Sequence, residues 1–366
     1  MKIQAAVFRE VGAGFNVETL DLEAPKSGEV LVKIEAAGVC HSDYHLVTGD
    51  LHHRKPVVPG HEGAGTVVEA GEGVTRVKQG DYVALNWAPN CGECFYCLDG
   101  RPSLCSKFIP SIWAGTMQDG SVRLSKDGEQ VYHFSAISCF AEYAVVPQES
   151  CVPLSREVPA TIAALIGCAV TTGVGAVRNT ARVKPGSSVA VIGAGGVGLS
   201  TIMGAALAEA SKIIAVDLVE SKLKLAKEFG ATDTLLASEN MHKQIQELTD
   251  GRGADYVFEA IGNPVVQEQA LKAVRPGGTL VLEGIAPMGS TTNLPGALIT
   301  RRELTIMGSY YGSANTAEDF PTYADLYLEG KLDLDRLISK TYTLDEINAA
   351  YEDLVGGNIA RGVIVF

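Results

Sequence analysis

Four cysteines form the most informative cluster of reactive side chains in the sequence. Cys91, Cys94, Cys97 and Cys105 have the spacing C-x2-C-x2-C-x7-C. Thiolates this close in sequence can converge on one tetrahedral ion, which is typical of structural zinc. Four unrelated core cysteines or two disulfides are the alternatives, but neither explains four of the chain's eight cysteines in so short a run. A zinc ion with four protein ligands has no position for substrate, so we expect the chemistry elsewhere.

A second set of metal ligands is scattered along the chain. Cys40 lies in GVCHSDYH, His61 and Glu62 in GHEGAG, and Cys168 in ALIGCA. Two thiolates and one imidazole would leave a fourth position for water or substrate. Spacing alone leaves alternatives open, because a lone histidine is often a core residue and a cysteine in an Ala-rich helix often only packs.

A glycine-rich turn predicts a dinucleotide site. Gly193, Gly195 and Gly198 form G-x-G-x-x-G between an apolar run and a helix-like segment, and Gly196 and Val197 complete the turn. The first glycine permits the tight turn, the second lets the backbone approach a pyrophosphate, and the third allows close helix–strand packing. The N–H groups at the start of the helix would then face the phosphates.

Asp217 ends the next apolar run, KIIAVD. A carboxylate there can accept hydrogen bonds from the adenosine ribose and repel a 2′-phosphate, which favours NAD over NADP. The alternative is a helix-capping aspartate. Lys222 lies one turn further along and could reach the ribose, although a solvated lysine is a serious alternative.

The elements that position these residues change character along the chain. The first part has short β-branched runs separated by Gly, Pro and Asp, which predicts a mostly antiparallel, barrel-like domain. After an uncharged Ala-rich helix, apolar strands alternate with helical stretches, which predicts an α/β fold with a parallel sheet. We expect domain segments at 1–155 (with a zinc lobe at 90–106), 156–310 (with a shared helix at 156–178) and 311–366, the last returning to the first domain.

Composition excludes several classes of partner. The net charge of −13 argues against nucleic acid or an anionic membrane surface. The first ten residues contain no signal-peptide core, and cysteines without a secretory signal fit a reducing cytosol, so we expect a cytoplasmic protein. Residues 187–208 carry no charge, but their glycines fit strand–turn–helix better than a membrane span.

Taken together, the motifs resemble one family. GVCHSD, GHEGAGTV, the four-cysteine lobe, GCAVTTG, GAGGVG and the terminal ARGVIVF follow each other along essentially the whole chain. In this combination the chain resembles the zinc-dependent medium-chain alcohol dehydrogenases. The resemblance implies a GroES-like β-rich catalytic domain in two sequence pieces and a Rossmann domain, which is a doubly wound parallel sheet.

The resemblance also implies roles for individual residues. The catalytic zinc ligands would be Cys40, His61 and Cys168. Beside them, Glu62 would be a carboxylate that approaches the zinc, and Asp43 a carboxylate that orients the histidine. Ser42 would place a hydroxyl next to the substrate oxygen, and His45 would be a distal proton acceptor. Thr172 would contact the nicotinamide region, and His41 and Arg361 would face the pyrophosphate. The substrate pocket would be lined by Trp87, Phe134, Pro110 and Ile285.

The implied reaction is reversible oxidation of a primary alcohol by NAD, with two zinc ions per subunit. Zinc would act as a Lewis acid on the alcohol oxygen, and the substrate carbon would transfer hydride to the nicotinamide. The two aromatic residues favour benzyl-type or medium-chain aliphatic alcohols. The expected assembly is a homodimer or homotetramer joined near residues 294–310.

Other functions remain alternatives. Glutathione-dependent formaldehyde dehydrogenases carry an arginine where this chain has Ile109, although Lys107, Arg54 and Lys55 could hold an acidic thiol adduct such as S-(hydroxymethyl)glutathione. Polyol dehydrogenases often have Glu in place of Cys168, and quinone reductases of the superfamily lack the zinc ligands. A sensor that binds NAD(H) without efficient catalysis is the alternative outside enzyme function.

Overall fold

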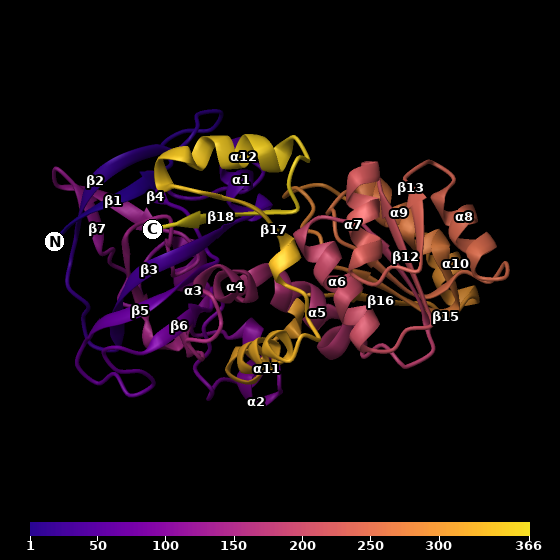
Figure 1. Ribbon diagram of the computed structural model, residues 1–366, viewed down its shortest axis with the longest axis horizontal. Coiled ribbons are helices and arrows are strands. Elements are labelled where there is room, and N and C mark those ends of the chain that lie inside the picture. Colours follow the sequence, from indigo (N-terminus) through magenta and orange to yellow (C-terminus); the bar gives the residue numbers. More distant parts are fainter. The chain divides into compact units, whose positions relative to one another are not determined.

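The computed structural model describes residues 1–366 and divides into two compact units. Unit 1 comprises Met1–Cys168 and Asn315–Phe366, and unit 2 comprises Ala169–Ala314. The chain therefore leaves unit 1 and returns to it, as the yellow C-terminal elements among the indigo strands show in Figure 1. The first division falls inside the Ala-rich helix, between Cys168 and Ala169, in the segment 156–178 that we expected both domains to share.

Unit 1 is built mainly from strands. Its β-branched runs form two sheets, with strand orders β1-β2-β7-β8-β4 and β10-β6-β5-β3-β18-β17, and β9 also pairs with β3. Most pairs are antiparallel; β4 with β8 and β17 with β18 are parallel. The strands are β1 (Lys2–Val7), β2 (Asn16–Leu22), β3 (Glu29–Val39), β4 (Val57–Val58), β5 (Gly63–Ala70), β6 (Tyr82–Leu85), β7 (Leu124–Lys126), β8 (Glu129–His133), β9 (Tyr143–Pro147), β10 (Cys151–Pro153), β17 (Ile338–Tyr342) and β18 (Arg361–Val365).

The helices of unit 1 are short, except near the C-terminus. They are α1 (His41–Thr48), α2 (Phe95–Leu98), α3 (Ile109–Ala114), α4 (Ala160–Leu165), α11 (Thr316–Leu328) and α12 (Ile347–Val355), with 3-10 turns at Pro102–Leu104, Gln148–Ser150, Asp335–Leu337 and Leu344–Glu346. The final strand, β18, pairs with β3 in the register Gly362 to Val39. This antiparallel pairing brings Arg361, the first residue of β18, beside the Cys40 end of β3.

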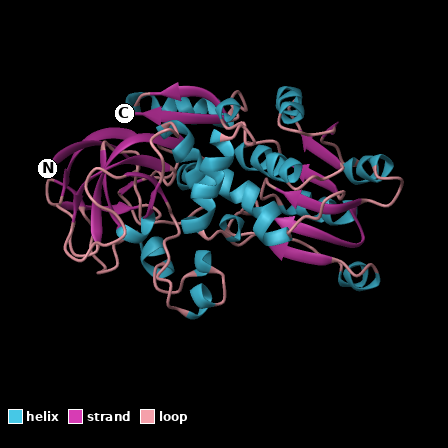
Figure 2. Cartoon of the chain, turned by 60° about the horizontal axis from the view of Figure 1, so that its bottom comes forward, coloured by secondary structure: helices cyan, strands magenta, loops and turns pink.

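Unit 2 is a parallel sheet of six strands in the order β13-β12-β11-β14-β15-β16. This is the doubly wound order, and Figure 2 shows helices on both sides of the strands. Its elements are β11 (Ser188–Ile192), β12 (Lys212–Asp217), β13 (Asp233–Leu236), β14 (Ala254–Glu259), β15 (Val274–Leu282), β16 (Thr305–Gly308), α5 (Thr171–Gly175), α6 (Gly196–Leu207), α7 (Glu220–Glu228), α8 (Met241–Leu248), α9 (Pro264–Ala273), α10 (Gly296–Arg301) and a 3-10 turn at Tyr311–Ser313. The strands are near-continuous apolar runs because both faces of the sheet are covered.

The Ala-rich helix runs from Ala160 to Ala181 and is long and apolar enough to span a membrane. However, 89% of its most apolar window is buried inside the protein, as expected for a core helix. The helix is not α-helical throughout: it has π-helical turns at Ile166–Val170 and Ala176–Ala181. The first of these turns contains Cys168.

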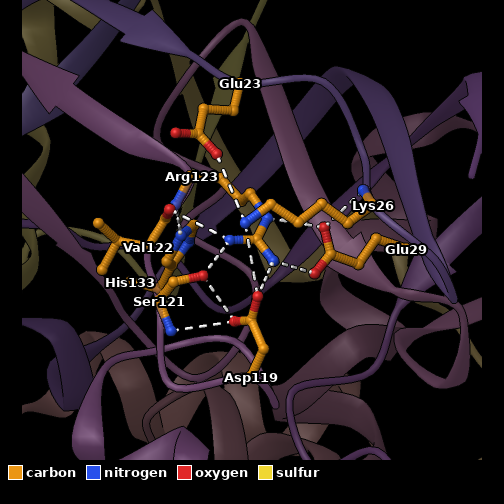
Figure 3. Close-up of polar contacts among 8 residues, drawn as sticks. All are labelled: Glu23, Lys26, Glu29, Asp119, Ser121, Val122, Arg123 and His133. Atoms are coloured by element: carbon orange, nitrogen blue, oxygen red, sulfur yellow. Dashed lines mark hydrogen bonds and ion pairs between the residues drawn. The ribbon is translucent and has the colours of Figure 1, made fainter.

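A buried arginine connects the two sheets of unit 1 (Figure 3). The Arg123 side chain has no exposed surface, and its Nε donates to the Glu29 carboxylate over 2.8 Å. The guanidinium also contacts Asp119 at 3.0 Å, and the Arg123 backbone N–H donates to His133 Nε2 over 2.9 Å. A buried charge is tolerated only when it is paired, so Arg123 must keep these partners. Keeping them fixes loop 117–123 in one position.

Candidate active site

The four lobe cysteines come together as the spacing predicts. Their Sγ atoms lie 3.5 Å (Cys94 to Cys97), 3.6 Å (Cys91 to Cys105) and 3.9 Å apart (Cys91 to Cys97, and Cys94 to Cys105). A tetrahedron with Zn–S bonds of about 2.3 Å has edges of about 3.8 Å. The N–H groups of Cys91 and Cys94 also point at cluster sulfurs, at 3.4 Å. The four thiols therefore fit one zinc ion.

Three separate segments of unit 1 meet in a second cluster. Cys40 follows β3, His61 and Glu62 precede β5, and Cys168 lies in the π-helical turn of the long helix. Their ligand atoms all lie within 4.8 Å of one another, and all four residues are buried. A π-helical turn inserts one residue into the α-helical repeat and is frequent at functional sites. Here it includes the cysteine that completes the cluster.

Asp43 orients the imidazole of this cluster. Its Oδ2 lies 3.0 Å from His61 Nδ1, and its Oδ1 accepts the N–H of Gly60 over 2.8 Å. A carboxylate on Nδ1 fixes the tautomer and leaves Nε2 for a metal. Glu62 Oε1, 3.9 Å from that Nε2, is buried and has no hydrogen-bond partner. The orphaned oxygen and the soft donor set both fit a zinc ion at this position.

Arg361 lies against this cluster. The resemblance led us to expect it to face the cofactor pyrophosphate, but its guanidinium is buried and donates to Glu62 Oε2. Any role toward the cofactor stays a prediction. The charges of Glu62 and Arg361 cancel each other. The charge of a divalent ion would therefore be balanced by the two thiolates alone.

The two thiols of the cluster are in hydrogen-bond contact with each other. The Cys168 thiol donates to the Cys40 sulfur, which lowers the pKa of Cys40 well below its usual value and raises that of Cys168. Burial raises the pKa of Glu62 to about 7, although the Arg361 charge opposes the shift. A metal held by these sulfurs would bind them as thiolates.

Ser42 and His45 lie on α1, next to the cluster. Ser42 Oγ is 3.6 Å from Cys40 Sγ. His45 is one turn further along, with its side chain 32% exposed and its Nδ1 3.4 Å from Asp50 Oδ2. The helix therefore carries one hydroxyl beside the cluster and one imidazole in contact with solvent.

Two of the four predicted pocket residues border the cluster. The ring centroids of Trp87 and Phe134 lie 6.3 and 5.9 Å from that of His61, both edge-on. Pro110 is exposed in the first turn of α3. Ile285 belongs to unit 2 and is 57% exposed. Trp87 and Phe134 thus form aromatic walls beside the cluster, and the assignments of Pro110 and Ile285 stay predictions.

The glycine turn lies between β11 and α6 in unit 2. Gly193 has φ +101, and a Cβ on Gly198 would meet the Gly193 carbonyl oxygen at 1.7 Å, so both positions require glycine. A Cβ on Gly195, by contrast, would meet nothing within 4 Å. The space beside Gly195 is therefore open for a ligand. The N–H groups of Gly196 and Val197 begin α6 at the same place, where an anion is stabilised.

Asp217 ends β12 beside this turn. Its Oδ2 accepts the Ala194 N–H over 2.7 Å and its Oδ1 accepts the Val219 N–H over 2.9 Å. Each oxygen keeps a further lone pair for a ribose hydroxyl. Lys222 lies half-buried in the first turn of α7. Asp217 is thus anchored at the turn, and its role in binding a ribose stays a prediction.

Two other predicted cofactor residues lie on helices. Thr172 is buried in α5, and the next residue, Gly173, packs against Val197 and Thr201 of α6: a Cβ there would lie 2.5 Å from the Val197 oxygen and 2.6 Å from the Thr201 nitrogen. His41 is exposed at the start of α1 in unit 1. Thr172 therefore lies one residue from a direct contact with the glycine-turn helix.

The sequence analysis missed a buried carboxyl at the same edge of the sheet. Glu283 directly follows β15, is 7% exposed, and lies 2.9 Å from Thr201 Oγ1. A signal was present, because Glu283 is the one charged residue in the apolar run GTLVLEGI. Its burial could not be predicted from a strand end, where acidic residues are usually solvated.

A hollow of about 720 Å³ lies at the opposite edge of the unit 2 sheet. Cations including Lys184, Lys212, Arg252 and Arg275 line it, together with Asp250 and Asp255. The amino ends of the strands meet there. Two of its cations are paired with its acidic residues, Arg275 with Asp255 at 2.5 Å and Arg252 with Asp250 at 3.2 Å. The nucleotide motif lies at the other edge.

Comparison with known proteins gives a consistent picture. A family model described as "Alcohol dehydrogenase GroES-like domain" matches residues 26–156, and one described as "Zinc-binding dehydrogenase" matches residues 196–329. An NDMA-dependent alcohol dehydrogenase from Amycolatopsis methanolica is 40% identical over 100% of this chain and 99% of its own length. An S-(hydroxymethyl)glutathione dehydrogenase from Synechocystis sp. is 40% identical over the full length of both.

The solved structures agree with the sequence relatives. Benzyl alcohol dehydrogenase from Acinetobacter calcoaceticus has a TM-score of 0.95 and 34% identity, with 100% of this chain and 99% of that chain covered. A zinc-binding-domain alcohol dehydrogenase from Burkholderia ambifaria gives the same TM-score, with 35% identity and the same coverage. The expected fold class, a β-rich GroES-like domain with a doubly wound parallel sheet, is therefore confirmed.

Proposed function

Since the chain belongs to the zinc-dependent medium-chain alcohol dehydrogenases, we propose that it oxidises primary alcohols to aldehydes with NAD, reversibly, at the cluster of Cys40, His61 and Cys168. The observation that carries the proposal is that cluster: three soft ligands and Glu62 meet within 4.8 Å, beside a hydroxyl and two aromatic walls. The lobe differs in that four thiols saturate its ion, whereas here only Cys40, His61 and Cys168 are soft ligands and Glu62 is paired with Arg361, so a position is left for substrate.

The chain's own residues would divide the work. A zinc ion held by Cys40, His61 and Cys168 would supply Lewis acidity to an alcohol oxygen, and NAD would accept the hydride. Ser42, the hydroxyl adjacent to the ligand cluster, would accept the alcohol proton while giving up its own to the nicotinamide ribose hydroxyl, which would pass a proton on to His45. His45 passes a proton to solvent through an imidazole whose Nδ1 is turned to Asp50.

The net charge of the cluster suits a site that must bind an alkoxide and then release an aldehyde. Two thiolates, a neutral imidazole and a divalent ion sum to zero charge, and Arg361 offsets Glu62. A neutral centre binds an anionic oxygen without holding it as tightly as a net cation would. Asp43 keeps His61 in the tautomer that this balance requires.

Asp217 supports NAD as the cofactor rather than NADP. A carboxylate at the end of β12 repels the 2′-phosphate and accepts the ribose hydroxyls. The open space at Gly195 supports a pyrophosphate next to the N-terminus of α6. Replacing Asp217 by Ala therefore lowers the preference for NAD over NADP.

Trp87 and Phe134 support flat, primary substrates. Both rings pack against His61, so an aromatic alcohol bound at the ligand cluster would contact aromatic side chains. A relative in structure is a benzyl alcohol dehydrogenase. We therefore place benzyl-type alcohols first and medium-chain aliphatic alcohols second.

A thiol-adduct substrate is the second candidate, because several relatives are S-(hydroxymethyl)glutathione dehydrogenases. The cations that could hold its carboxylates are already engaged in part. Lys107 pairs with Glu93 at 3.3 Å, and the Arg54 guanidinium lies 5.5 Å from the Tyr132 ring centroid. Ile109 supplies no charge where the glutathione-dependent enzymes have arginine.

A homodimer or homotetramer joined along the unit 2 sheet is part of the proposal. β16 is the last strand in the sheet order, and α10 before it has no buried residue. An edge strand with free backbone groups is a ready surface for pairing with a second copy.

Steady-state formation of NADH, followed by absorbance, tests the proposal. The panel comprises benzyl alcohol, 1-hexanol, 2-propanol and S-(hydroxymethyl)glutathione, each with NAD and with NADP, and the aldehydes with NADH. We expect the highest kcat/KM with benzyl alcohol and NAD. Zinc-replete protein that turns over none of these alcohols contradicts the proposal, and a higher kcat/KM with the glutathione adduct selects the second candidate.

A further inference from the structure

Glu283 lies in the half of the nucleotide edge that the glycine turn does not occupy. In a doubly wound sheet, a dinucleotide binds where the strand order reverses, here between β11 and β14. The glycine turn and Asp217 assign the adenosine half to β11, β12 and β13. The ends of β14 and β15, which carry Glu259 and Glu283, are therefore left for the nicotinamide half.

The only polar side chain bonded to Glu283 is the neutral hydroxyl of Thr201. Thr201 Oγ1 lies 2.9 Å from Glu283 Oε2 and 3.0 Å from the Val197 carbonyl oxygen. A hydroxyl has one proton, so Thr201 donates either to Glu283 or to Val197. Because this one shared donor is the only compensation for burying a carboxylate, the contacts favour the protonated carboxyl.

The surroundings keep that proton in place. No ionisable side chain is present on α5, α6, β11 or β16, and the loop that follows Glu283 to Pro295 has none either. The turn at Ala176–Ala181, which packs against β15, carries only Arg178, and this residue is exposed. The charged group that acts on Glu283 is Glu259, a second buried carboxyl. Burial raises the pKa of Glu283 well above its usual value, Thr201 opposes the shift, and Glu259 adds to it.

Glu259 is bonded as an anion. Its Oε1 accepts the N–H groups of Ile261 and Gly262 over 2.9 and 2.8 Å, and its Oε2 accepts from Gln267 over 3.2 Å. Three donors and no acceptor suit a carboxylate. The two buried acids therefore differ in protonation. Glu259 is a carboxylate whose hydrogen bonds hold the loop after β14, whereas Glu283 is protonated and the fold does not require it to be charged.

We propose that Glu283 makes the cofactor site sensitive to the redox state of the nicotinamide: the cationic ring of NAD⁺ drives the carboxyl proton into solvent, and the uncharged ring of NADH does not. The inference rests on the proposed NAD binding. Since an opposite charge nearby favours ionisation, NAD⁺ binding is coupled to loss of one proton from Glu283. By reciprocity, NAD⁺ binds more tightly as pH rises through the pKa of this group, whereas NADH binding lacks that dependence.

Isothermal titration of the zinc-replete protein with NAD⁺ and with NADH, between pH 6 and 9 and in two buffers of different ionisation enthalpy, measures the protons released. Wild type should release up to one proton more than Glu283→Gln on binding NAD⁺, and the same number on binding NADH. The NAD⁺ Kd of wild type should fall by up to tenfold per pH unit more steeply than that of the variant. Protons from other groups are common to both proteins.

Controls separate the inference from folding and from the proposed function. Glu247→Gln makes the same charge change at an exposed position of α8 and should behave as wild type. Glu283→Met, which has a similar shape and no proton, should reproduce Glu283→Gln. Equal proton release by wild type and both Glu283 variants overturns the inference while NAD binding stands. Failure of wild type to bind either nucleotide overturns the proposed function itself.

Discussion

At the residue scale, side-chain chemistry was easier to predict than side-chain position. The types of ligand at Cys40, His61 and Cys168 are evident in the sequence, but no spacing rule connects them. Their convergence depends on β3, β5 and a π-helical turn being brought together in unit 1. The resemblance to a family supplied that connection. It did not predict that Arg361 would be buried against Glu62, because that contact depends on the register of β18 on β3.

Replacing Cys168 by Ser tests the assignment of the ligand cluster. A serine hydroxyl is a poor zinc ligand at neutral pH, so the site would keep two good protein ligands instead of three. Metal analysis should give about one zinc ion per chain, held by the lobe, with turnover of alcohol lost. Cys151→Ser, the same change at a buried thiol outside both clusters, should keep both ions. Two ions retained in the Cys168 variant would contradict the assignment.

His133 makes the stability of unit 1 sensitive to acid. Its Nε2 accepts the Arg123 N–H, and burial together with the Arg123 charge lowers its pKa to about 3 (Figure 3). The unfolded chain takes up a proton below pH 6.5, while the folded chain does not until about pH 3. Stability is therefore lost as pH falls below 6.5, by about 2 kcal/mol at pH 5 from this group.

Urea unfolding at pH 7 and pH 5 measures this loss. Both tryptophans, Trp87 and Trp113, lie in unit 1, so their fluorescence follows its unfolding. In His133→Gln, whose amide oxygen can accept the same hydrogen bond, the drop between the two pH values should be about 2 kcal/mol smaller than in wild type. His52→Gln, at an exposed position, should match wild type. An identical drop in the His133 variant would remove His133 from the account.

At the element scale, local patterns were reliable. The lobe and the glycine turn are short, their residues are close in sequence, and the structure forms both as predicted. The doubly wound sheet also follows from the alternation of apolar strands and helices. The π-helical turns could not be predicted, because they depend on packing around the Ala160–Ala181 helix rather than on its own composition.

Gly195→Ala separates the role of the glycine turn in binding from its role in folding. The backbone at Gly195 has φ −83 and ψ −170, which alanine adopts, and its Cβ would meet nothing within 4 Å. Stability should be unchanged within about 0.5 kcal/mol. The methyl group would occupy the space proposed for the pyrophosphate, so we expect the Kd of NADH, from its fluorescence, to rise at least about tenfold.

The contrast with Gly198 sharpens this test. An alanine there would collide with the Gly193 carbonyl oxygen, so Gly198→Ala should lower thermal stability as well as NADH affinity. If Gly195→Ala binds NADH as wild type does, the pyrophosphate does not lie beside that residue. The glycine turn would then serve only the packing of β11 against α6.

At the scale of the whole molecule, charge and topology agree on a small-molecule enzyme. A net charge of −13 leaves no general surface for nucleic acid. The return of the C-terminus to unit 1 places Arg361 in the metal cluster, so an incomplete chain would lack a charge partner for Glu62. The sequence could not define the substrate, because of the four predicted pocket residues only Trp87 and Phe134 lie against the cluster.

The central claim is that one zinc ion is bound by Cys40, His61 and Cys168 with a position left for substrate. An anomalous difference map collected at the zinc absorption edge from crystals of the protein tests this most directly. We predict two peaks per chain: one within the lobe, and one about 2.0 to 2.3 Å from His61 Nε2 and the two sulfurs. A peak in the lobe alone, from protein that oxidises alcohols at full rate, would contradict the account.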